Sequence, residues 1–203
     1  MWRFWVFAAF LALSGCDSAV EEVEPEQLPD LIPLATGDRW VGTTEFTDER
    51  DPLPFQGGRD TVWVRSDSII AGVRRHFVVA PPGFGPLGWY ANTEEGVIQG
   101  LDFPWLPRLE VGETFEGGGT TIHRLQDVFY ALESGEVILA QRYRRRHTLV
   151  DNRELPFPEV DTLWTSPTHG FVRLNTAWVS LSDLDVLYRS RWRLLEFLPA
   201  PRH

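Results

Sequence analysis

The sequence predicts an all-β fold: an antiparallel meander of about ten strands that forms a barrel, half-barrel or sandwich. Three observations predict it. Runs of β-branched and aromatic residues recur along the chain. Gly, Pro, Asn or Asp interrupts these runs about every ten residues. No window longer than about twelve residues keeps the apolar i, i+3, i+4 spacing that is typical of a helix.

Short breaks between the apolar runs define the expected strands. These strands span residues 39–47, 60–70, 73–80, 88–92, 96–101, 119–133, 136–150, 160–165, 170–179 and 186–198. Tight turns are expected at Ala71-Gly72, Glu95-Gly96 and Ser134-Gly135, where glycine accepts a positive φ. Connections this short favour antiparallel neighbours.

The N-terminus has the features of an export signal. Arg3 supplies a positive charge, and Phe4 through Leu13 form an apolar run of ten residues. A membrane-spanning helix needs about 20 apolar residues, so this run fits the h-region of a secretory signal instead. The following Leu13-Ser14-Gly15-Cys16 resembles the lipobox of bacterial lipoproteins. That resemblance implies removal of residues 1–15, acylation of Cys16 with fatty acids such as palmitate, and stable membrane anchoring by two or more acyl chains.

The segment after the cysteine is acidic. Residues 17–30 contain six acids and no base, which indicates a solvated, self-repelling tether over residues 16–30. Alternatively, the acidic run resembles surface-export signals of some Gram-negative groups, while Asp17 resembles an inner-membrane retention signal. The expected location is therefore the cell envelope, on the periplasmic face or the cell surface. Residues 31–203 are long enough for one β-rich domain.

Composition excludes several chemistries. The net charge of −10 gives no broad positive field for nucleic acid. All 19 basic residues are arginine, which excludes a P-loop, a Schiff-base lysine and a lysine general base. Cys16 is the single cysteine, so its acylation leaves no thiol for disulfides, catalysis or metal binding. We expect no cofactor.

A seven-residue pattern occurs twice. Leu34–Trp40 and Leu109–Phe115 share the order Leu-x-x-Gly-acid-x-aromatic. A glycine turn that directs an aromatic side chain into the core explains the pattern, either as two ordinary turns or as a duplication. With the later His169-Gly170-Phe171, it resembles a diffuse group of secreted bacterial β-proteins of unknown function, which implies an architecture and no activity.

Other candidate motifs do not indicate a site. Gly83–Gly88 matches G-x-G-x-x-G, but its flanking prolines and the strand that follows exclude a dinucleotide fingerprint. No two histidines have the i, i+2 or i+4 spacing of a local metal pair, so no metal site is expected. The tryptophans after Cys16 fit core packing. Trp105 is the exception, because it lies in an expected loop and is a candidate for an exposed role.

Two arginine stripes are the strongest candidate for a contact surface. Side chains alternate along a strand. Each stripe therefore lies on one face of its strand. Arg142, Arg144 and Arg146 lie on the strand expected over residues 136–150, and Arg189, Arg191 and Arg193 lie on the last expected strand, residues 186–198. A two-residue turn at Ser134-Gly135 would place Asp127 opposite Arg142. The stripes are either a solvated outer face or a contact for an anionic partner, which arginine binds through bidentate donors.

Three functions remain open. The first is a lipid-anchored, non-enzymatic interaction module whose partner is an envelope protein or a polyanion. The second is a periplasmic carrier of an apolar ligand or lipid, because long antiparallel meanders in lipoproteins resemble lipid-shuttling half-barrels. The third is a hydrolase with a pair of carboxylates in a cleft. The fold alone does not choose among them.

Overall fold

In the computed structural model, the described residues are 28–48, 55–80, 88–100, 103–150, 153–179 and 186–201. The expected signal peptide, Cys16 and the tether up to residue 27 lie outside them, as do residues 83–87 of the G-x-G-x-x-G segment. No helix occurs among the described residues, so none there could span a membrane.

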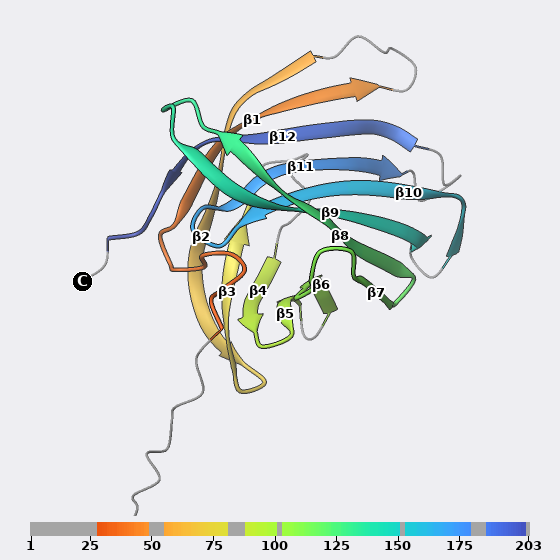
Figure 1. Ribbon diagram of the computed structural model, residues 1–203, viewed down its shortest axis with the longest axis horizontal. Coiled ribbons are helices and arrows are strands. Elements are labelled where there is room, and N and C mark those ends of the chain that lie inside the picture. Colours follow the sequence, from red (N-terminus) through yellow and green to blue (C-terminus); the bar gives the residue numbers. More distant parts are fainter. Residues whose placement is uncertain are drawn as a thin grey trace, which may run out of the picture.

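The fold is all-β, as the sequence predicts, with twelve strands among the described residues instead of about ten (Figure 1). The strands are β1 (Arg39–Asp48), β2 (Phe55–Ile70), β3 (Val73–Val79), β4 (Gly88–Thr93), β5 (Gly96–Gln99), β6 (Phe103–Pro107), β7 (Thr114–Gly117), β8 (Thr120–Ala131), β9 (Val137–Val150), β10 (Arg153–Ser166), β11 (Gly170–Val179) and β12 (Val186–Leu198).

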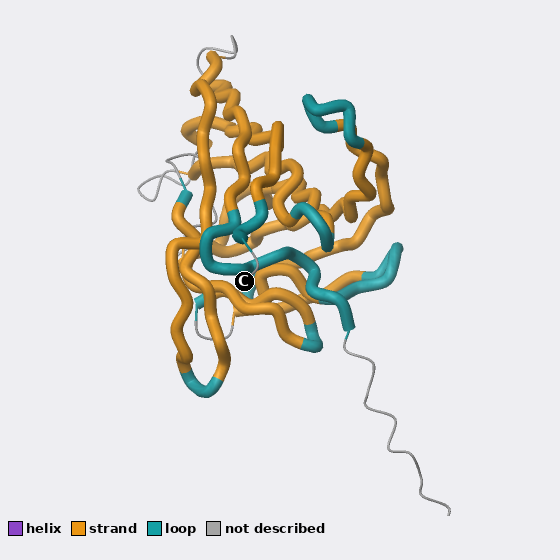
Figure 2. The backbone as a smooth tube through the Cα atoms, turned by 90° about the vertical axis from the view of Figure 1, so that its left-hand side faces the viewer, coloured by secondary structure: helices purple, strands orange, loops and turns teal. Residues whose placement is uncertain are grey.

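All twelve strands form one antiparallel sheet in the order β6-β5-β4-β3-β2-β1-β12-β11-β10-β9-β8-β7. Every neighbouring pair is consecutive along the chain except β1 and β12. The edge strands β6 and β7 are joined by residues 108–113 alone. In that connection the Arg108 amide donates to the Glu95 carbonyl, and the Gly112 amide donates to the Arg124 carbonyl. The sheet is therefore a nearly closed barrel (Figures 1 and 2).

The edge strands β6 and β7 were not predicted from the sequence. Phe103–Pro107 was expected to be a loop, yet its two prolines are tolerated in an edge strand, where a missing N–H costs no ladder bond. The candidate exposed role of Trp105 is wrong, because its side chain is 3% exposed. The indole lies edge-on to Tyr90 and Phe171, with ring centroids 5.4 and 5.7 Å away.

Large aromatic side chains pack the inner face of the sheet. Trp40, Trp192, Tyr90, Tyr143 and Phe171 are each at most 1% exposed. The Trp40 indole N–H donates to the His169 carbonyl at 2.7 Å. Its ring lies so close to Gly170 that a Cβ on that glycine would be 2.5 Å from Nε1. The described part of the interior is therefore a packed core.

A charged cluster is also buried on the inner face, between β9 and β10. The Asp161 side chain is 4% exposed and lies 2.9 Å from Arg145 Nη2 and 3.0 Å from His147 Nε2. Burial on its own would raise the pKa of Asp161, but the His147 hydrogen bond and the Arg145 charge outweigh it and lower the pKa. The Arg145 guanidinium also lies 5.7 Å from the Trp105 ring centroid.

The two seven-residue patterns form the same turn. Gly37 and Gly112 both have positive φ, at 102° and 93°. In both copies the acid accepts a bond from the amide three residues earlier: Asp38 from Ala35 at 2.8 Å, and Glu113 from Glu110 at 2.7 Å. Both turns also bond to the second strand after them, at Val64 of β2 and Arg124 of β8. Each copy opens a run of six consecutive strands. The shared bonds favour duplication over two ordinary turns.

The turn between β8 and β9 differs from the expectation. The Leu132 amide donates to the Glu136 carbonyl at 2.8 Å, so three residues form the loop, not the two at Ser134-Gly135. The strand register consequently shifts by one, and Asp127 lies opposite Gln141. The predicted pairing of Asp127 with Arg142 is wrong; its carboxylate instead pairs with Arg124 at 2.7 Å.

Candidate functional site

Both arginine stripes lie on the outer face of the sheet, opposite the face on which Trp192 and Leu194 are buried. Strand register extends the stripes across neighbouring strands. One continuous row crosses β9, β10, β11, β12, β1 and β2 through Arg142, Trp164, Arg173, Arg193, Thr43 and Arg59. Four of the six positions in this row are arginines, so positive charge gathers on this part of the face.

The β8–β9 hairpin crosses over this face (Figure 1). In the side view of Figure 2, the tip of the hairpin stands away from the other strands. The Tyr130 hydroxyl donates to the Leu194 carbonyl of β12 at 3.1 Å. Near the tip, Glu133 lies 3.8 Å from Arg59 of β2, and Glu136 lies 3.2 Å from His169. These contacts hold the hairpin over the arginine row.

A pocket of about 280 Å³ lies between the hairpin and the sheet. Its lining residues are Glu45, Tyr130, Ala131, Arg173, Arg191 and Arg193. Of the three arginines, Arg191 alone has a carboxylate nearby in the described part of the chain, Glu45 at 3.8 Å. Among the described residues, no acid pairs with Arg173 or Arg193. We name this feature the arginine pocket.

The electrostatics of the arginine pocket favour an anion. Burial and the neighbouring Arg191 charge lower the pKa of Arg173. Its only side-chain hydrogen bond among the described residues is a long one of 3.4 Å from Nε to Asn175 Oδ1. An anion would offset both the desolvation and the repulsion. Burial raises the pKa of Tyr130 despite Arg193 and Arg173, so its hydroxyl stays a neutral donor.

Trp164 links the arginine pocket to Arg142. The guanidinium groups of Arg173 and Arg142 lie 5.0 and 5.8 Å from the Trp164 ring centroid. The Nε of Arg142 is buried and has no hydrogen-bond partner in the part of the chain that the structure describes. Arg142 is therefore positioned beside the pocket rather than in its lining.

Of the six predicted contact residues, Arg142 lies beside the pocket and the other five fall into two groups. Arg191 and Arg193 line the pocket, while Arg144, Arg146 and Arg189 are exposed on the same face outside it. Arg173 and Tyr130 were not among the residues predicted from the sequence. Finding Arg173 requires the β11–β12 register, which pairs it with Arg193, and no turn signal in the sequence fixes that register.

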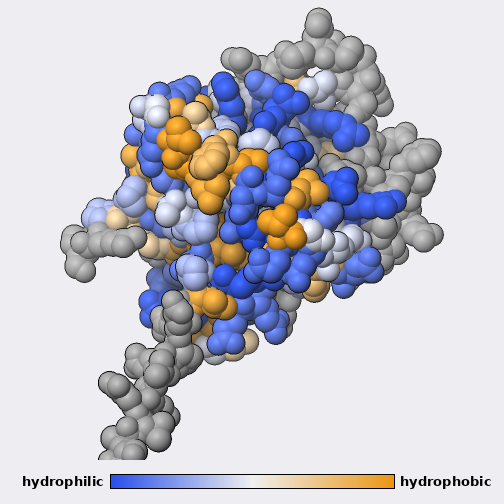
Figure 3. Space-filling model, in the orientation of Figure 1, coloured by the Kyte–Doolittle hydropathy of each residue, from blue (hydrophilic) through white to orange (hydrophobic). Residues whose placement is uncertain are grey.

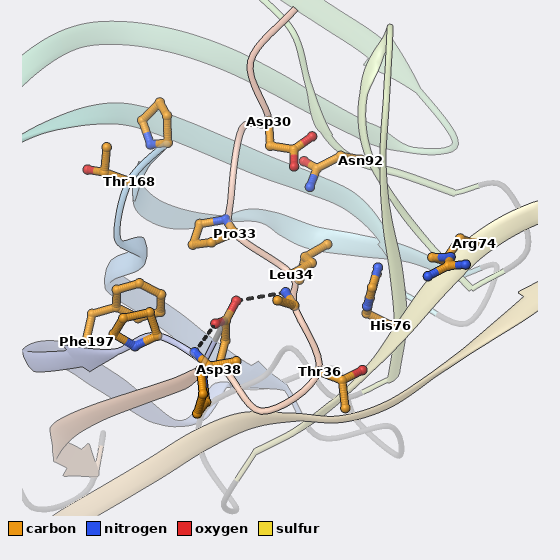
Figure 4. A pocket seen from close by; sticks show the side chains of 15 residues that line it. Asp30, Pro33, Leu34, Thr36, Asp38, Arg74, His76, Asn92, Thr168 and Phe197 are labelled. Carbon is orange, nitrogen blue, oxygen red and sulfur yellow. Dashed lines mark hydrogen bonds between the residues drawn. The ribbon is translucent and has the colours of Figure 1, made fainter. Parts of the chain in front are cut away.

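A larger pocket of about 910 Å³ lies where the two ends of the domain meet (Figure 4). Its polar groups mainly bond to the backbone segments just before β1 and just after β12. Asp38 accepts hydrogen bonds from the Ala35 and Ala200 amides, both at 2.8 Å. Asn92 likewise bonds to the backbone of Leu31 and Ile32. Neither this pocket nor the arginine pocket is the enclosed apolar cavity that a lipid carrier needs.

One inner-face cluster has the residue types of a catalytic triad. His147 Nδ1 lies 3.3 Å from the Thr120 hydroxyl, and its Nε2 lies 3.0 Å from Asp161. Thr120 is buried, however, and Arg145 donates twice to the same Asp161 oxygen. This geometry fits a buried ion cluster. No group of three potential metal ligands occurs among the described residues.

Comparison with known proteins gives structural similarity alone. No protein-family model matches the chain, and no curated protein matches it. A Bacteroides fragilis structure, provisionally described as an exported protein with a YmcC-like fold, is 7% identical, with a TM-score of 0.42 over 85% of this chain and 100% of its own. A Parabacteroides distasonis structure, provisionally described as a lipoprotein, is 9% identical, with a TM-score of 0.40 over the same shares. At these levels, function has to be inferred from the site itself.

Proposed function

We propose that this chain is a lipid-anchored, non-enzymatic envelope protein that binds an anionic group of its partner in the arginine pocket. The observation that supports this most directly is the convergence of Arg173, Arg191 and Arg193 on one pocket whose described lining contains one acid, Glu45. Guanidinium groups offer paired N–H donors, which match the oxygens of phosphate, sulfate and carboxylate groups. The Tyr130 hydroxyl at the pocket wall already donates its proton to the Leu194 carbonyl, so the guanidinium groups supply the donors for an anion.

The pocket size restricts what the site accepts. About 280 Å³ suits one anionic group, not a folded chain or a whole polymer. A polyanion or an envelope protein would therefore present a single acidic group to the pocket, with the exposed Arg144 and Arg146 adding weaker, salt-screened attraction around it.

Binding of inorganic pyrophosphate to the full chain tests the site. Changing both Arg173→Gln and Arg193→Gln removes two charged donors, each worth about 1.5 kcal/mol or more, so affinity is expected to fall by about 100-fold. Isothermal titration calorimetry at about 0.15 M salt, where exposed charges are screened, measures the change.

A charge-matched variant provides the control. The Arg144→Gln, Arg189→Gln protein loses the same net charge from the same face, but outside the pocket lining. Its affinity is expected to stay within about twofold, because exposed charges are screened. Equal weakening in both double variants would show that pyrophosphate responds only to net charge, and would refute the pocket.

The anchor is tested separately. Wild-type protein is expected to incorporate radiolabelled palmitate in the cells that export it, and Cys16→Ser is expected to lose the label and the membrane association together, because the serine hydroxyl does not replace the thiol in lipoprotein acylation. Fractionation with autoradiography measures both. Equal labelling of the two proteins would exclude Cys16 as the attachment point.

A further inference from the structure

The β8–β9 hairpin exposes an apolar surface on the side that faces away from the arginine pocket. Phe129 is 81% exposed, Val137 is 61% exposed and Leu139 is 51% exposed. Phe129 lies directly opposite Leu139 in the ladder, and Val137 follows on the same face. Apolar side chains gather at the upper left of Figure 3, where the hairpin lies in Figure 1. Contiguous exposed apolar side chains of this kind mark interaction sites.

The same hairpin has an open strand edge. β7 pairs with β8 from Thr120 to His123 only, and Arg124 bonds to the connection before β7. Beyond Arg124, no described strand pairs with β8 on the side away from β9. Residues 125–131 therefore form an unprotected edge next to the apolar surface, and such edges tend to pair with another strand.

The alternation of hydrogen-bonded and non-hydrogen-bonded pairs between β8 and β9 identifies which backbone groups of β8 point to the open edge. The Leu132 amide bonds to the Glu136 carbonyl, so Tyr130 and Ile138, two residues further along, form a hydrogen-bonded pair. The alternate residues Asp127, Phe129 and Ala131 then direct their N–H and C=O groups to the open edge. Their side chains lie on the exposed face together with Leu139.

We propose that a second copy of this chain pairs with the edge, antiparallel and around a two-fold axis at Phe129. Phe129 then lies opposite Phe129 of the second copy, and Asp127 lies opposite Ala131 of the second copy. Every available N–H and C=O in residues 127–131 meets a complementary group, so the edge complements itself in this register.

Side-chain chemistry agrees with this register. The two Phe129 rings, flanked by Leu139 and Val137 of each copy, form one continuous apolar strip. The Asp127 carboxylates are offset by about 13 Å along the strands, beyond the Debye length at physiological salt. A lipid bilayer fits less well, because hydrocarbon would leave the edge N–H and C=O groups unpaired. The paired region is short, so a weak dimer is expected.

Cysteine cross-linking of the full chain in detergent tests the dimer. In a Cys16→Ser background, Asp127→Cys and Ala131→Cys are made in separate preparations and mixed. Opposite residues of a hydrogen-bonded pair have Cα atoms about 5.5 Å apart, within disulfide range. Mild oxidation is expected to give about tenfold more cross-linked dimer in the mixture than in either preparation alone, because the like cysteines are about 13 Å apart.

A substitution at the two-fold axis gives the matched control. Adding Phe129→Lys to both preparations places two ammonium groups opposite each other and is expected to abolish the excess cross-link. Ile69→Lys, at a 71% exposed position on β2, is expected to leave it unchanged. Circular dichroism checks that both lysine variants are folded. The dimer is overturned if the mixture cross-links no better than its components, or if Phe129→Lys leaves the excess intact.

Discussion

Replacing Asp161 by alanine is expected to lower the free energy of unfolding by about 3–5 kcal/mol, because it leaves the Arg145 guanidinium without its anion in the interior. The Asp161 side chain is 4% exposed and that of Arg145 is 12% exposed. Asp161 also accepts a long bond of 3.4 Å from the Ala177 amide of β11, so its loss disturbs three strands. Urea denaturation measures the change.

Two comparisons isolate the cause. Asp161→Asn keeps the side-chain size and removes the charge, so a loss close to that of alanine would assign the effect to the ion cluster. Asp127→Ala breaks an Arg–Asp pair of similar length, 2.7 Å, whose carboxylate is 39% exposed, and is expected to cost about 1 kcal/mol or less. Similar losses at Asp127 and Asp161 would contradict a special role for the buried cluster.

The Asp161 cluster also makes stability depend on pH. The pKa of Asp161 is lower in the folded chain than in the unfolded chain, so its contribution is present above the unfolded-state value of about 3.9. The contribution is lost as pH falls through the folded-state pKa. Wild-type and Asp161→Asn stabilities are therefore expected to converge in acid. A difference that stays constant across this range would contradict the lowered pKa.

Trp40→Ala is expected to lower the free energy of unfolding by a similar amount, about 3–5 kcal/mol. The indole is fully buried and packs against Phe171 and Phe197, with ring centroids 5.0 and 5.7 Å away. Its loss also leaves the His169 carbonyl without the donor that now lies 2.7 Å from it. Because the Gly170 backbone lies against the ring, rigid surroundings limit collapse into the cavity.

Trp63→Ala is the matched control for Trp40→Ala. Trp63 lies on the neighbouring strand β2 and is 37% exposed. Its removal is expected to cost about 1 kcal/mol or less, because part of its surface is already in water. Equal losses at the two positions, measured by denaturation in urea, would show that Trp40 is not central to the core.

The sequence indicated much of the fold because the evidence for it is local. Alternation placed Arg191 and Arg193 on one face of the last strand, and they lie on the outer face, opposite the buried Trp192 and Leu194. The two-residue turn at Ala71-Gly72 is present, with φ of 52° and 81°. Edge strand β6 was missed because prolines that would break a central strand are tolerated at an edge. The repeated glycine turn was visible, but only its hydrogen bonds showed that the two copies are alike.

The site was less predictable because it depends on contacts between distant strands. Arg173 and Arg193 meet only through the β11–β12 register. The pocket also needs the β8–β9 hairpin to fold over the sheet, and the Tyr130 to Leu194 bond that holds it there joins residues 64 positions apart. Strand alternation indicated the face on which the arginines lie, but not which of them converge.

The most direct test of the arginine pocket is to observe its guanidinium groups while an anion is added. In ¹H–¹⁵N spectra of the Nε–H groups, Arg173, Arg191 and Arg193 are expected to shift together and to saturate as pyrophosphate is titrated, while Arg144 and Arg146 shift little. Uniform, unsaturated shifts of all five arginines would contradict a specific anion site on this face.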